Sequence, residues 1–165
     1  MQVDAIRELF TYNAWANGRI LAAAEGLTET EYTTPFPGLS HGSLRATLVH
    51  TLAAEIIWRQ RCLEGFSPDR LLGEADAPTF DALRARWTME EAALHAGLAT
   101  LTDAALAEPF AYKNTRGAPL ADTRWKVLAH VVNHGTQHRA EAAVALTALG
   151  RSPGDVDYIV YLRQK

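Results

Sequence analysis

The sequence predicts an all-α protein that folds as a four-helix bundle. Alanine, leucine, glutamate and arginine, which are good helix formers, dominate its long segments. Apolar residues recur in four of these segments at spacings of three to four, and stretches with glycine and proline separate them. Amphipathic helices of about 20–28 residues bury their apolar faces well against one another in a bundle. We therefore expect one domain, residues 1–165.

The first two helices are predicted at residues 3–25 and 43–64. The first has the helical spacing of apolar residues, and Gly26 follows its last periodic residue. The second begins after a serine cap, for which Ser40 and Ser43 are both candidates. The segment between the two helices contains prolines and glycines, so we expect it to be a loop.

The third and fourth helices are predicted in the second half of the chain. The third covers residues 80–101 and follows Thr79, a residue type that caps helices. The fourth starts near Asp122 or Thr123 and ends at Gly150. These four helices account for most of the apolar surface that the chain must bury.

No segment has a convincing strand pattern. We expect residues 102–121, between the third and fourth helices, to be irregular. The C-terminal segment, residues 156–165, is apolar enough to dock on the body of the bundle. Both expectations concern segments without the long periodic pattern of the four helices.

Composition and charge exclude several classes of protein. The chain has 16 Lys and Arg against 19 Asp and Glu, a net charge of −3, and no cationic run that would bind nucleic acid. No apolar run approaches the length of about 20 residues that a membrane span needs. Cys62 is the single cysteine, which excludes an internal disulfide and a cysteine-rich zinc site. The first ten residues do not resemble a signal peptide, so we expect a cytoplasmic protein.

Three histidines at four-residue spacing, His130, His134 and His138, form the strongest chemical motif. Neighbours in this series point within about 40° of each other and lie about 6 Å apart along a helix axis, so two imidazoles can bind one metal ion. His130 and His138 are about 12 Å apart along the axis, and only one adjacent pair can ligate. Spacing alone does not decide whether the ligating pair is His130 with His134 or His134 with His138. The alternative is that these histidines hydrogen-bond to side chains of neighbouring helices.

His50 is the best candidate for a third ligand. It lies in the middle of the second predicted helix, on the same side as small apolar residues, and should face inward. Alone, it would be interpreted as a core histidine with a hydrogen-bond partner. Together with an inward histidine pair it would complete a three-histidine site. Such a site leaves positions for water or substrate, which is typical of catalytic metal centres.

The remaining candidates are less informative. His41, in the loop before the second helix, is expected to be exposed, or to line the mouth of a site. His95 is interpreted as structural, and His130 as a hydrogen-bonding support for a ligand. Glu141 either orients His138 or is an ordinary surface acid. No catalytic side chain is assigned, because the reacting group is expected to be a water molecule or a thiolate at the ion.

One apparent motif is rejected. Residues 38–42 match the G-x-S-x-G pattern of hydrolase nucleophiles. That turn needs a strand before the serine and a helix after it on an α/β sheet, and this chain predicts no sheet. We interpret the segment as a loop that enters a helix.

Three blocks of sequence resemble the DinB/YfiT-like family, also called the damage-inducible DinB family. They are YNAWAN, TLVHTLAAEIIWRQR and LAHVVNHGTQHRAEAAVALTALGRSPGDVDYIVYLRQ, and their order covers nearly the whole chain. The resemblance implies up-down-down-up topology and one divalent ion, zinc or nickel, on His50, His134 and His138. It thus selects the second histidine pair. It also implies a homodimer, because related proteins often dimerise.

The resemblance and the histidines together give two functional hypotheses. The first is a metal-dependent enzyme that acts on a small molecule as a thiol S-transferase or hydrolase, because some relatives use low-molecular-weight thiols such as bacillithiol. The second is a metal-stabilised stress-response or binding protein without turnover. Under both, the partners are small molecules and a second copy of the chain, with no nucleic acid and no membrane. The two hypotheses differ in whether the protein ligands leave the coordination sphere open.

Overall fold

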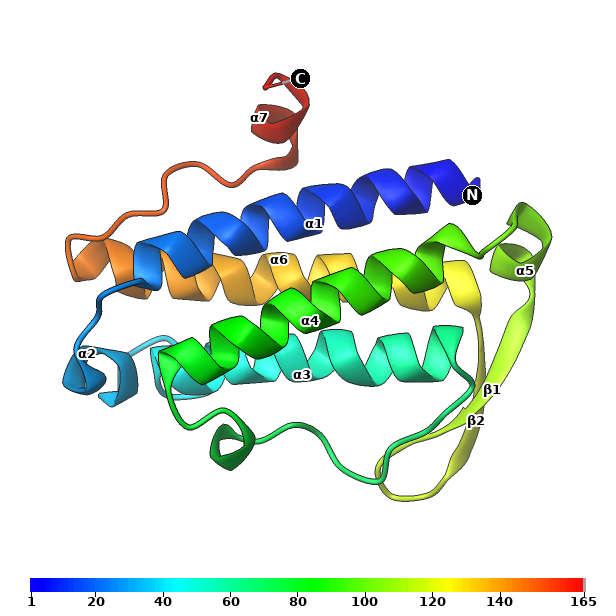
Figure 1. The fold of residues 1–165 in the computed structure, drawn as a ribbon, viewed down its shortest axis with the longest axis horizontal. Coiled ribbons are helices and arrows are strands. Elements are labelled where there is room, and N and C mark those ends of the chain that lie inside the picture. Colours follow the sequence, from blue (N-terminus) through cyan, green and yellow to red (C-terminus); the bar gives the residue numbers. More distant parts are fainter. Residues whose placement is uncertain (165) are drawn as a thin grey trace.

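Four long helices form the body of the protein in the computed structural model, which describes residues 1–164 (Figure 1). They are α1 (Val3–Ala24), α3 (Leu44–Leu63), α4 (Phe80–Ala99) and α6 (Arg124–Ala148). α1 and α6 run in one direction, and α3 and α4 run in the other. The predicted all-α bundle with up-down-down-up topology is therefore confirmed.

The ends of these helices follow from local capping. The Ser43 side chain accepts a hydrogen bond from the backbone N–H of Ala46 at the start of α3, so Ser43, not Ser40, is the cap. The Thr79 side chain does the same for Ala82 at the start of α4, as predicted. The long helices lie within about two residues of their predicted bounds, the usual uncertainty of helix ends.

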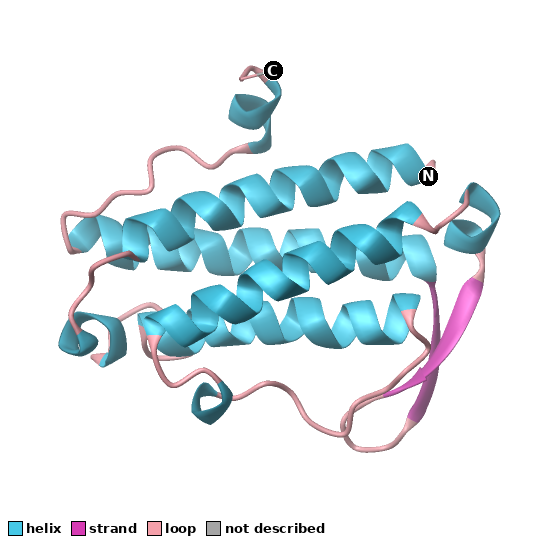
Figure 2. Ribbon diagram, in the orientation of Figure 1, coloured by secondary structure: helices cyan, strands magenta, loops and turns pink. Residues whose placement is uncertain are grey.

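The prediction of no strand is wrong at one place, because residues 102–121 are not irregular throughout. β1 (Pro109–Lys113) and β2 (Pro119–Thr123) form an antiparallel hairpin at the end of the bundle where α6 begins (Figure 2). Phe110 and Tyr112 alternate with exposed residues and face the core. The alternation lasts only five residues and each strand starts with proline, so the pattern was too short to predict a strand.

The connecting segments contain four short helices that were not predicted. They are α2 (Glu29–Thr33), η1 (Glu74–Asp76), α5 (Asp103–Ala107) and α7 (Tyr158–Leu162). The last confirms that the tail docks: Tyr161 is buried, and the Tyr12 hydroxyl of α1 donates to the Val156 carbonyl at 3.0 Å. The long connection from α3 to α4 returns the chain to the end of the bundle where α3 begins. The two helices therefore run in parallel.

The core consists of two apolar clusters with a polar layer between them. Along α1, Ile6 and Phe10 belong to one cluster and Ile20 to the other, and the buried Asn13 and Asn17 lie between. The polar layer continues into the neighbouring helices. Among residues 1–164, no helix combines the length and the apolar character that a membrane crossing requires.

Candidate metal centre

Three histidine nitrogens meet where α3 packs against α6. His50 extends from α3, and His134 and His138 extend from successive turns of α6. The Nε2 atom of His134 lies 3.1 Å from that of His50 and 3.2 Å from that of His138. The structure thus brings together all three side chains that were predicted as ligands.

The arrangement fits a shared ion better than it fits hydrogen bonding. A ring nitrogen carries either one proton or one lone pair in the ring plane, so His134 Nε2 cannot form a well-directed hydrogen bond with both neighbours. Nitrogen ligands with bonds of 2.0–2.1 Å in a tetrahedral site lie about 3.3 Å apart. The two observed separations are close to that value. Nitrogen donors in this number and spacing can hold a divalent transition metal ion.

The protonation of the histidines also favours metal binding. Burial, together with the nearby His41 and His138, lowers the pKa of His50 to about 4. Burial, together with His138 and His50, lowers the pKa of His134 to about 4 as well. At neutral pH both rings are therefore neutral, which is the form that binds a metal ion.

Glu141 and Ser40 hold the Nδ1 side of the His138 ring. Glu141 Oε2 lies 3.2 Å from His138 Nδ1, and it accepts hydrogen bonds from the Ser40 hydroxyl at 2.9 Å and the Ser40 backbone N–H at 3.3 Å. Partial burial raises the pKa of Glu141, but the bonds from Ser40 and His138 outweigh it and hold this pKa below its ordinary value. A carboxylate on Nδ1 leaves Nε2 of His138 as the free lone pair, the usual support of a metal-binding histidine.

His41 is the fourth histidine of the cluster. Its ring stacks on that of His50 with centroids 3.8 Å apart and planes inclined by 25°, and its centroid is 5.1 Å from that of His138. One nitrogen from each of His41, His50 and His138 lies within 4.8 Å of the others. This group contains His41 in place of His134. We expected His41 to be exposed or to line the mouth of a site, and the structure places it closer to the other histidine nitrogens than that.

The other histidines lie outside this cluster of nitrogens. His130 is exposed, its ring centroid is 5.6 Å from that of His134, and no hydrogen bond joins the two rings within residues 1–164. Its role as a support for a ligand stays a prediction. His95 belongs to α4 and is half-buried away from the cluster. Cys62 is buried, which raises the pKa of its thiol to about 12 and agrees with a packing role.

A buried polar network lies beside the histidines. Glu55 Oε1 accepts hydrogen bonds from the side-chain amides of Asn13 at 2.6 Å and Asn17 at 2.8 Å, and its Oε2 accepts from Trp87 Nε1 at 3.1 Å. Arg139 Nη1 donates to the amide oxygens of the same two asparagines, at 2.5 and 2.9 Å. The amides therefore link the buried carboxylate to the buried guanidinium and tie α6 to α1 and α3.

A glycine in α6 makes room for this network. A Cβ atom at Gly135 would lie 2.7 Å from Arg139 Nη1 and 2.9 Å from Asn13 Oδ1, both too close for a real contact. Glycine weakens a helix interior by up to about 1 kcal/mol relative to alanine. Gly135 lies in the turn between His134 and His138, where Asn13 of α1 approaches the helix backbone closely and leaves no room for a side chain.

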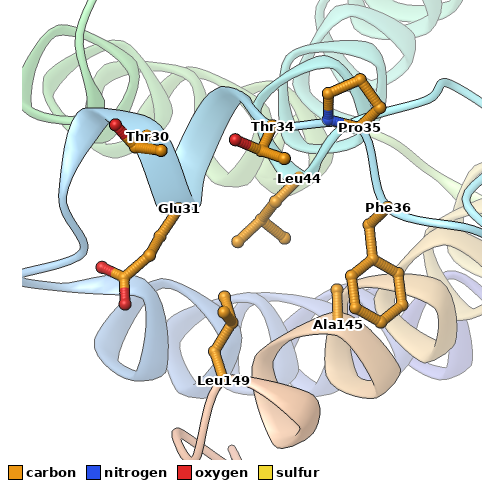
Figure 3. A pocket seen from close by; sticks show the side chains of 8 residues that line it. All are labelled: Thr30, Glu31, Thr34, Pro35, Phe36, Leu44, Ala145 and Leu149. Carbon is orange, nitrogen blue, oxygen red and sulfur yellow. The ribbon is translucent and has the colours of Figure 1, made fainter.

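The cavity in Figure 3 differs in chemistry from the candidate metal centre. It has a volume of about 200 Å³ and lies between α2, the start of α3 and the end of α6. Leu44 and Leu149 point toward one another across it, and Phe36 and Ala145 line one side. Its one carboxylate, Glu31, already caps α2. The cavity holds no cluster of metal ligands, so the histidines remain the candidate reactive site.

Fold and cluster together define a helical-bundle protein with a candidate metal centre between two antiparallel helices. The sequence model of the DinB family matches residues 1–165, and the chain belongs to that family. Protein DinB from Bacillus subtilis (strain 168) is similar to it, with 28% identity over 172 residues that cover 96% of this chain and 94% of the relative. The family that the three sequence blocks resemble is thereby confirmed.

Proposed function

We propose that this protein is a metal-dependent enzyme that acts on a small molecule, with His50, His134 and His138 as the ligands of one divalent ion. The observation that carries the proposal is the approach of His134 Nε2 to the other two Nε2 atoms, at 3.1 and 3.2 Å. Zinc or nickel suits three imidazoles. The reaction type that we propose is thiol S-transfer or hydrolysis.

The chain's own residues support an open site. Three histidine ligands leave coordination positions for a small molecule, and an ion in such a site acts as a Lewis acid that lowers the pKa of water or a thiol. Glu141 accepts from His138 Nδ1 and so fixes the ring that presents Nε2. His50 and His134 are half-buried, and His41, which stacks on His50, is exposed, so the site borders solvent on the side of the loop before α3.

A metal-stabilised binding protein without turnover is the second candidate. The specific observation in its favour is His41, because a fourth histidine close to the other nitrogens can complete a closed site. The two candidates predict the same metal content and differ in whether small ligands reach the ion.

The first test is the metal content of protein purified without a histidine tag. We expect about one divalent transition-metal ion per chain, either as purified or after reconstitution with zinc or nickel. Elemental analysis combined with protein quantification measures this ratio. If no transition metal remains bound after reconstitution and desalting, the proposal is wrong.

The second test asks whether thiols reach the ion. A ligand that binds only the folded metal form raises the melting temperature, by about 2–4 °C for each kcal/mol of binding in a chain of this size. We expect bacillithiol or a related thiol to raise the melting temperature of the metal-loaded protein and to leave the metal-free protein unchanged. An equal response of both forms would exclude thiol binding at the ion.

We also propose that the protein is a homodimer. Large apolar side chains are exposed on two helices, Val144 on α6 and Met89 on α4, and can pack against a second copy of the chain. Light scattering at tens of micromolar protein should give twice the chain mass of 18.1 kDa. A mass equal to that of one chain would contradict the dimer.

A further inference from the structure

The loop between α2 and α3 holds its backbone in place next to the histidines. The Phe36 N–H donates to the Gly42 carbonyl at 2.7 Å, and Ser40 is bound to Glu141. Gly38 and Gly42 have φ values of 92° and 86°, which residues with a side chain rarely adopt. These turns set His41 directly beside His50.

The His41 ring is positioned by this loop, but no hydrogen bond fixes it. The residue is exposed, and its imidazole makes no hydrogen bond to any other residue in the described part of the chain. His138 is the opposite case, because it is 4% exposed and its Nδ1 contacts Glu141. Rotation of the His41 side chain therefore exchanges a stacking contact for water, whereas movement of His138 breaks a buried contact.

The distances allow His41 to reach the ion proposed above. Two nitrogen ligands of one ion lie at most about 4.2 Å apart, which is twice the usual bond length. One nitrogen from each of His41, His50 and His138 lies within 4.8 Å of the others, so a small side-chain movement brings His41 within ligand distance of this pair.

We propose that His41 is a fourth, displaceable ligand that occupies the open position of the three-histidine centre until a small anionic donor, such as a thiolate, replaces it. This inference rests on the proposed metal site. Displacement forms one bond between the donor and the ion and breaks one bond to a neutral imidazole, with no change in oxidation state. The four-histidine form is the resting form, and the three-histidine form binds the ligand.

Occupation of the open position by His41 lowers the affinity of any competing ligand by a predictable factor. If the ring holds the position nine-tenths of the time, the apparent dissociation constant of the competitor rises about tenfold. Removal of the imidazole should therefore tighten the binding of a small anion while the ion stays bound to His50, His134 and His138.

The experiment uses cobalt(II)-substituted full-length protein and azide as the probe. We expect His41→Ala to retain cobalt, to change the visible absorption spectrum that reports coordination number, and to bind azide about tenfold more tightly than the unaltered protein. His95→Ala is the matched control, since it removes a histidine from α4 and should match the unaltered protein in all three measurements. Circular dichroism confirms that both variants are folded.

Three results would overturn the inference, and they are distinguishable. An unchanged spectrum and azide affinity in His41→Ala, with cobalt bound, would show that His41 is not a ligand and would leave the metal site intact. Complete loss of cobalt from His41→Ala, with retention by His134→Ala, would make His41 an obligatory ligand in place of His134. If the unaltered protein binds no metal ion, the proposed function and this inference are both wrong.

Discussion

Two polar regions lie side by side in this bundle, and consecutive residues of α6 belong to different ones. His138 faces the histidine cluster, and Arg139, rotated by about 100° on the helix, faces the Glu55 network. In the network donors face acceptors: the amides and the Trp87 indole donate to Glu55, and Arg139 Nη1 donates to the amide oxygens, although the buried Nε of Arg139 has no partner among residues 1–164. In the cluster, nitrogens face nitrogens. The first region is held together by hydrogen bonds within the chain, whereas the second is a candidate site for a metal ion.

The largest expected effect tests the cluster. His138→Ala should abolish metal binding, because it removes a proposed ligand that is buried and in contact with Glu141. His130→Ala should lower the affinity at most about 10–100-fold, the usual effect of a residue next to the ligands. Metal content and calorimetric affinity of the two variants measure the difference, and circular dichroism confirms folding. If His130→Ala loses the ion and His138→Ala keeps it, the site must be assigned to His130 and His134.

The second prediction tests the Glu55 network. Glu55→Ala leaves the buried donors of Asn13, Asn17 and Trp87 without their acceptor, and each such group costs about 1–3 kcal/mol. We expect a loss of at least about 3 kcal/mol in the free energy of unfolding. Glu55→Gln keeps one acceptor oxygen and should lose less. Urea denaturation measures both, and equal losses in the two variants would contradict this prediction, because glutamine, which keeps the volume and one acceptor oxygen, would then be no better than alanine.

The third prediction compares two helical glycines. Gly135→Ala should destabilise the protein by about 1–3 kcal/mol, because the new methyl group collides with Arg139 and Asn13. Gly18→Ala is the matched control in α1, where a Cβ meets nothing within 4 Å, and it should stabilise by up to about 1 kcal/mol. Thermal or urea unfolding gives the sign of each change. A stabilising Gly135→Ala would show that Arg139 and Asn13 do not pack tightly against the backbone of α6.

The smallest expected effect is a difference in pH dependence. Burial raises the pKa of Glu55, despite the opposing hydrogen bonds of Asn13 and Asn17 and the charge of Arg139. The folded protein then keeps a proton that the unfolded chain releases above its ordinary pKa of 4.5. The contribution of Glu55 to stability is therefore complete below that pKa and decreases as the pH rises from it toward the folded pKa. The stability of Glu55→Gln, measured by urea unfolding across this range, should lack this decrease.

Sequence reasoning worked where periodicity alone decides a position. The four helices and the inward-facing His50 followed from residue spacing along a helix. Spacing could not choose between His130 and His138, because both stand four residues from His134. The height at which α3 crosses α6 decides this, and it is a property of the packed bundle. His50 meets the turn of His134 and His138.

Contacts that depend on loops were missed for a different reason. Ser40 and Glu141 are 101 residues apart in the chain, and only the turns around Gly38 and Gly42 bring them together. The Glu55 network was also missed, although a glutamate within an apolar helix segment is a signal that a buried partner set exists. Glu55 lies on α3, and the other side chains of the network lie on α1, α4 and α6. The pattern of residues along one helix contains no information about such partners.

The order of the helices has a consequence for synthesis and folding. His50 and His134 are 84 residues apart, and the chain between them includes the crossover connection, α4 and the hairpin. Loop-closure entropy grows with the logarithm of this length, so bringing the two halves of the cluster together costs more than forming a contact between neighbouring turns. A nascent chain that ends before α6 contains half of the nitrogens. The assembled cluster therefore marks a molecule in which α6 has been made and has packed against α3.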